Sequence, residues 1–77
     1  MVHLTEDAKS KKYWFLEEDL LKPIDWEYFY SLPKIVQDSL ELYMRGQVSI
    51  GKAAEILRIS LRDLDLIRAK AHIPIRI

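Results

Sequence analysis

The sequence contains no cysteine, so disulfide bonds, thiol nucleophiles and cysteine-based zinc sites are all excluded. Long hydrophobic runs are also missing. The longest uninterrupted apolar stretch is four residues, 13–16, whereas a transmembrane helix needs about 20. The N-terminal residues lack the basic start and apolar stretch of a secretory signal. We therefore expect a cytoplasmic protein.

Glycine and proline are scarce, with two and three residues in a chain of 77, and no flexible linker or internal repeat is visible. Apolar residues make up 49% of the chain and charged residues 31%, which is a globular composition. A chain this short allows one domain with a modest core. Stability must come from packing, to which we expect a homodimer interface to contribute.

The formal net charge is zero, but the two halves of the chain differ. Residues 1–44 carry five lysines and nine carboxylates, a net charge of −4. Residues 45–77 carry seven cations and three carboxylates, a net charge of +4. This division suits a module that touches nucleic acid at one end and another partner at the other. Chance segregation of surface charge accounts for it equally well.

Helix start and stop signals divide the second half of the chain into three helices, which predicts an all-α protein with a small three-helix core. Pro33 suits the first turn of one helix, and Gly46 ends that helix. Ser49 can cap a second, short helix, and Ser60 can cap a third that must end before Pro74. The tail that follows this helix, residues 72–77, alternates apolar with other residues, as an extended edge segment does.

Seven of the eight aromatic residues lie within the first 31 residues, where we expect a further helical segment. Asp25 can cap a short helix through Tyr30. The leucines that fit another helix, ended by Pro23, are Leu16, Leu20 and Leu21. The aromatic residues either close the core, which we favour, or anchor a subunit or partner interface. For the second role the candidates are Trp14, Phe15, Trp26 and Phe29. Residues 1–31 would then pack on the core or on a partner, and residues 32–77 would form the main domain.

Residues 48–71 have the spacing of a helix-turn-helix. Small side chains are needed where two short helices cross, and Ala53 and Ala54 supply them. The apolar residues expected to bracket the turn and point back to the core are Leu57, Ile59, Leu64 and Ile67. Arg58 stands where a glycine with positive φ is usual, so the turn is either strained or of a different type.

The outward face of the second helix in this pair decides between two functions. Arg62 suits the recognition of guanine, but Asp65 would face phosphates unfavourably, and two leucines would meet a polar groove. For a DNA-binding protein, the expected contacts are Lys52, Arg58, Ser60, Arg62 and Arg68. The alternative is an adaptor that binds protein through the same scaffold. Its expected contacts are Leu61, Leu66, Ile73 and Ile75.

The stretch of residues 40–75 resembles a family of small, uncharacterised prokaryotic proteins common in archaea and cyanobacteria. The matching pattern includes Leu42-Tyr43, the Gly-Lys-Ala-Ala-Glu run at 51–55, and Ile73-Pro74. Members are regarded as antitoxins, often beside a PIN-domain ribonuclease toxin. The resemblance implies that this chain neutralises such a toxin and represses its own operon. The sequence departs from the family at Ala71-His72, where a glycine is usual, and in its N-terminal third.

No catalytic arrangement is visible in the sequence. His3 and His72 lie in the two tails without a third ligand at metal spacing. Asp63 and Asp65 would point to different faces of a helix. Neither a phosphate-binding glycine loop nor a nucleophile with its base is present. We therefore expect neither an enzyme nor a bound cofactor or metal.

Overall fold

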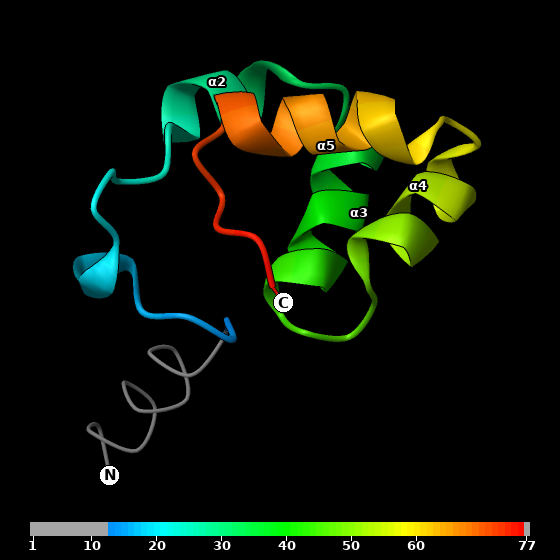
Figure 1. Ribbon diagram of the computed structural model, residues 1–77. Helices are drawn as coiled ribbons and strands as arrows, with labels where there is room; N and C mark the ends of the chain where they lie inside the picture. The colour runs from blue at the N-terminus through cyan, green and yellow to red at the C-terminus, as the bar shows by residue number, and fades with distance from the viewer. Residues whose placement is uncertain (1–12, 77) are drawn as a thin grey trace, which may run out of the picture.

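A computed structural model of the chain describes residues 13–76, and within that range all regular secondary structure is helical. The elements are the 3-10 helix η1 (Glu17–Asp19) and the α-helices α2 (Trp26–Ser31), α3 (Lys34–Met44), α4 (Ile50–Leu57) and α5 (Leu61–Lys70). α3 packs against both α2 and α4, and α4 packs against α5 (Figure 1). The predicted all-α fold is confirmed.

The predicted helix starts are formed by the capping residues that the sequence indicates. The side chains of Asp25, Ser49 and Ser60 each accept a hydrogen bond of 3.0 Å from the backbone N–H three residues further on. Each bond satisfies one of the donors that the first turn of a helix leaves free. Gly46 adopts a φ of +78° just after α3, which glycine allows without strain.

One hydrophobic core joins the four α-helices. Its fully or nearly fully buried apolar residues are Ile24, Phe29, Leu40, Tyr43, Met44, Ala53, Ala54, Leu64, Ala71 and Ile73. Half-buried residues pack against this core at the positions predicted to bracket the α4–α5 turn, including Leu57, Ile59 and Ile67. Because the buried positions of α4, Ala53 and Ala54, carry only a methyl group, the α4 backbone can approach its neighbours closely.

The N-terminal segment is attached to α3 by its backbone as well as by its rings. The backbone N–H of Trp14 donates to the carbonyl of Met44 at 2.9 Å, and its indole N–H donates to the carbonyl of Tyr43 at 3.0 Å. The backbone N–H of Asp25 donates to the carbonyl of Ala71 at 2.9 Å. Residues 13–32 therefore share the core of the later helices.

The prediction of a helix that contains Leu16, Leu20 and Leu21 is wrong, because only the short 3-10 helix η1 forms there. Pro23 disfavours helical backbone at the preceding residue, and the span left before it is too short to sustain an isolated helix. The indole N–H of Trp26 donates to the Glu17 carboxylate at 3.0 Å, an interaction that holds the turn against α2.

The C-terminal tail forms no strand within the described residues, so the expected edge segment has no sheet to join. Instead the tail returns along α3 (Figure 1). The Tyr43 hydroxyl accepts a hydrogen bond from the backbone N–H of Arg76 at 2.6 Å and donates to the carbonyl of Pro74 at 3.2 Å. Between residues 13 and 76, no helix is long and apolar enough to cross a membrane.

Candidate nucleic-acid interface

The connection between α4 and α5 is three residues long, from Arg58 to Ser60. Arg58 adopts φ 59° and ψ 40°, so the strained left-handed turn, rather than a different type of turn, is formed. The backbone N–H of Arg58 donates to the backbone carbonyl of Glu55 at 3.0 Å, and that of Ile59 donates to the backbone carbonyl of Ala54 at 3.1 Å. This is the hydrogen-bond pattern of the Schellman motif, which glycine usually completes. The left-handed conformation costs a non-glycine residue about 1 kcal/mol or more.

Three exposed cations lie on α4, in this connection and at the start of α5. Lys52 lies on the outer side of α4, with its ammonium nitrogen 3.5 Å from the Glu55 carboxylate, a weak pair between two exposed side chains. Arg58 and Arg62 are exposed and form no ion pair within the described part of the chain. Their charges are therefore free to meet an anion at the start of α5, where the helix dipole also attracts negative charge.

Ser60 lies between the two arginines as the N-cap of α5. Its hydroxyl oxygen accepts the backbone N–H of Asp63 at 3.0 Å, which leaves its own proton able to donate to a phosphate oxygen. Asp63 is exposed in the same first turn, and its carboxylate opposes the neighbouring cations. The local field is therefore positive but modest.

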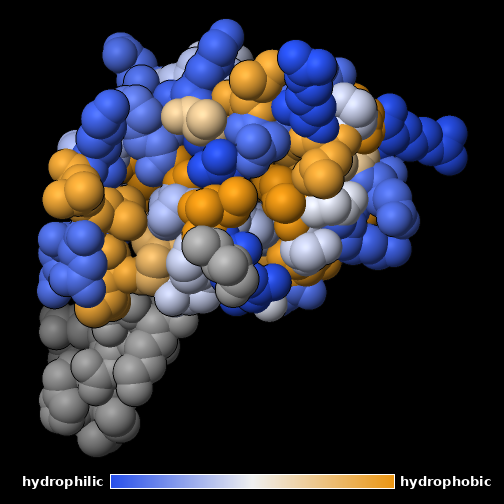
Figure 2. Space-filling model, viewed as in Figure 1, coloured by the Kyte–Doolittle hydropathy of each residue, from blue (hydrophilic) through white to orange (hydrophobic). Residues whose placement is uncertain are grey.

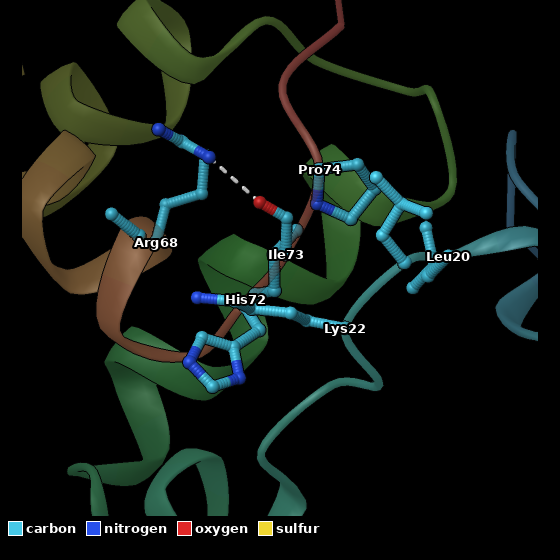
Figure 3. A pocket seen from close by; sticks show the side chains of 8 residues that line it. Leu20, Lys22, Arg68, His72, Ile73 and Pro74 are labelled. Atoms are coloured by element: carbon cyan, nitrogen blue, oxygen red, sulfur yellow. Dashed lines mark hydrogen bonds between the residues drawn. The ribbon is translucent and has the colours of Figure 1, made fainter.

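Arg68 lies apart from these cations, against the C-terminal tail (Figure 3). Its side chain is only 13% exposed, and its Nε donates to the Asp65 carboxylate at 2.8 Å. Its Nη1 donates to the carbonyl of Ile73 at 2.7 Å. Arg68 thus fixes the tail to α5 through Nη1, and its Nε pairs with the Asp65 carboxylate. Its guanidinium is therefore engaged within the described chain, unlike those of Arg58 and Arg62.

An apolar hollow lies beside Leu61 and Arg62 at the start of α5. The open hollow, of about 590 Å³, is lined by Ile50, Leu61, Arg62, Asp65 and Ile75. Leu61 and Leu66 are both more than half exposed. Figure 2 shows apolar surface between charged side chains on the face that carries α5 and the tail. This face therefore combines cationic and apolar groups.

The residues expected at a partner interface are divided by the structure into buried and accessible groups. Phe29 and Ile73 are buried within this chain, so a surface role is not open to them. The half-buried members are Trp14, Phe15 and Trp26, and the exposed ones are Leu61, Leu66 and Ile75. Tyr30, absent from that set, is exposed beside Trp26. Its spacing four residues after Trp26 on α2 was the signal that could have identified it.

His72 belongs to no group of metal-binding side chains in the described part of the chain. Within residues 13–76, no three His, Asp or Glu side chains are grouped to hold a metal ion. The Nδ1 atom of His72 lies 3.3 Å from the carbonyl of Pro23, and His3 falls outside the described residues. A second open hollow, of about 410 Å³, lies between Leu20 and Pro74 beside His72 (Figure 3).

No protein-family model, no curated protein and no solved structure matches this chain. The antitoxin resemblance of residues 40–75 therefore stays a prediction from the sequence.

Proposed function

We propose that the chain is a DNA-binding regulator in which α4 and α5 act as a helix-turn-helix. The observation that carries this proposal is the pair of exposed arginines without ion-pair partners in the described chain, Arg58 and Arg62, on either side of the α5 N-cap. In a helix-turn-helix, residues at the start of the second helix reach the base edges while the first helix crosses the backbone. The two short helices and their tight connection fit that use.

Each cation has a separate role in this proposal. Arg62 follows the N-cap by two residues, where a guanidinium can donate two hydrogen bonds to a guanine. Lys52, Arg58 and the Ser60 hydroxyl contact phosphates, which fix the register of the protein on the duplex. A single chain offers only these few contacts to DNA, and its affinity for DNA is therefore low. We expect a homodimer that binds two half-sites.

The sequence resemblance extends the proposal to an antitoxin. In that role the protein acts in the cytoplasm, represses its own operon through α4 and α5, and neutralises a ribonuclease toxin through other surfaces. The opposite net charges of the two halves support a division between a DNA end and a partner end.

Fluorescence anisotropy with the duplex from upstream of the gene, measured over a series of salt concentrations, tests DNA binding. The double variant Lys52→Ala/Arg58→Ala should weaken binding and reduce the salt slope by roughly 2 units, because each phosphate contact that is lost reduces the counterions released on binding by about 0.9. The matched control is Lys22→Ala/Lys34→Ala, which removes the same charge from the acidic half. Absence of binding at low salt, or an equal effect of the control, would refute the proposal.

A protein-binding adaptor is the second candidate, and the exposed apolar hollow beside Leu61 favours it. Leu61→Ala distinguishes the two functions, because this side chain lines the hollow, is 52% exposed and lies outside the buried core. An adaptor would lose partner affinity in this variant, whereas a regulator that uses Arg62 would keep most of its affinity for DNA.

A further inference from the structure

Four aromatic rings form a continuous series at the acidic end of the molecule, which we call the aromatic face: Tyr30, Trp26, Tyr13 and Phe15. Neighbouring rings along the series are nearly parallel, with interplanar angles of 24°, 29° and 22°. Their centroids are 5.6, 6.4 and 5.4 Å apart, which is offset stacking. The series joins α2 to the segment before η1.

The aromatic face is accessible from solvent. Tyr30 is 66% exposed although it stacks on Trp26, and the other three rings are half-buried. The core needs the inner parts of these rings, because they pack against Phe29 and its neighbours. The Tyr30 ring also meets the Phe29 ring edge-to-face, at 5.3 Å between centroids, but most of its surface stays in solvent. An exposed aromatic series of this kind marks an interaction surface.

Carboxylates without cationic partners in the described chain adjoin the aromatic face. They are Glu17, Glu18, Asp19 and Glu27. Glu17 is held beside the Trp26 ring, because its Oε1 accepts the indole N–H at 3.0 Å while Oε2 keeps its lone pairs. In the second half, Glu55 and Asp65 each have a basic partner, and of its three carboxylates Asp63 alone forms no ion pair in the described chain. The negative charge at this end is therefore left for a group outside the described chain.

We propose that the aromatic face docks an arginine-bearing, positively charged segment of a protein partner. A guanidinium can stack on an aromatic ring and at the same time donate two hydrogen bonds to a carboxylate. Tyr30, with its exposed ring, and Glu27, exposed on the same short helix, offer these two groups. A lysine ammonium matches this combination less well, because it is a strongly hydrated point charge.

Single-stranded nucleic acid also stacks on aromatic rings, but its phosphates need cations beside the rings. Here the flanking groups are carboxylates, which repel phosphates. The charge therefore favours a cationic protein segment over nucleic acid. This proposal does not depend on DNA binding by α4 and α5.

The test is a titration of the full chain with a fluorescein-labelled peptide of arginine, glycine and serine, beside the same peptide with lysine for arginine. We expect the arginine peptide to bind roughly threefold more tightly, and Tyr30→Ala to weaken it by about two- to fivefold, the range of an exposed cation–π contact. Ile35→Ala is the matched control, because Ile35 is similarly exposed, at 61%, but lies outside the aromatic face. Glu27→Gln should also weaken binding, whereas Glu55→Gln, with the same charge change on α4, should not.

Circular dichroism of each variant checks that the fold is retained, which is expected because the replaced side chains are exposed. The proposal is overturned by equal binding of the two peptides, by equal effects of Tyr30→Ala and Ile35→Ala, or by no binding of the arginine peptide at low salt. Binding of a single-stranded oligonucleotide that Tyr30→Ala weakens would also overturn it and would assign the face to nucleic acid.

Discussion

Residues 13–32 and residues 50–70 both pack around α3, but they do so by different means. The first region uses large aromatic side chains and backbone hydrogen bonds from irregular chain, such as the bond from Trp14 to Met44. The second uses two regular helices with small residues, Ala53 and Ala54, at the close approach. A chain of 77 residues can thus fill one core with bulky rings on one side and with close backbone packing on the other.

If the two regions share one core, the largest effect should come from removing the central ring of the first. Phe29→Ala deletes a buried aromatic side chain and should cost about 3–5 kcal/mol, much of the stability of a domain this small. Urea denaturation followed by circular dichroism and by tryptophan fluorescence should show one coincident transition at a lower midpoint. An unchanged helical transition beside a lost tryptophan transition would show that the regions are independent.

Close packing of α4 in the second region predicts that a larger side chain there lowers the free energy of unfolding, though by less than Phe29→Ala does. Ala53→Leu should cost about 1–3 kcal/mol, because the fully buried site has no room for three more carbons. Glu55→Leu places the same side chain on the exposed side of α4 and should be nearly neutral. Equal midpoints of thermal unfolding for the two variants would contradict the close approach of the helices.

The tail belongs to neither region, and the Tyr43 hydroxyl is one of the groups that attach its end to α3. Tyr43→Phe removes the two hydrogen bonds to Pro74 and Arg76 and should cost about 1–2 kcal/mol in chemical denaturation. The ring itself stays, so the core is unaffected. Amide hydrogen exchange should accelerate at Arg76 but not within α4; uniform acceleration would point to a general loss of packing instead.

The smallest expected change in stability is an increase, at Arg58. Arg58→Gly relieves the left-handed strain of the α4–α5 connection, and we expect a gain of up to about 1 kcal/mol in the free energy of unfolding. The same change should weaken DNA binding, because a phosphate contact is lost. A variant that is more stable and binds DNA equally well would remove Arg58 from the proposed interface.

The second region was largely predictable because local signals define it. Ser49 and Ser60 cap their helices as their spacing indicates, and Ala53, Ala54 and Leu64 are buried as the pattern requires. These features depend on neighbours within a few residues. A sequence pattern can therefore identify them.

The first region was less predictable because distant contacts define it. The path of residues 13–25 is determined by hydrogen bonds to Met44 and Ala71, which leave no periodic trace in the sequence. For the candidate site, the exposure of Arg62 followed from its place on the helix. The engagement of Arg68 did not, because it depends on the tail bringing the Ile73 carbonyl back to α5.

The two indole rings occupy separate environments, and this gives the protein two native optical reporters. Trp14 is bonded to the end of α3, and Trp26 lies within the aromatic series near the acidic surface. Replacing one indole at a time by phenylalanine would leave emission from a single position. Detachment of the chain from α3 and ligand binding at the aromatic face could then each be followed through its own indole, without an attached dye.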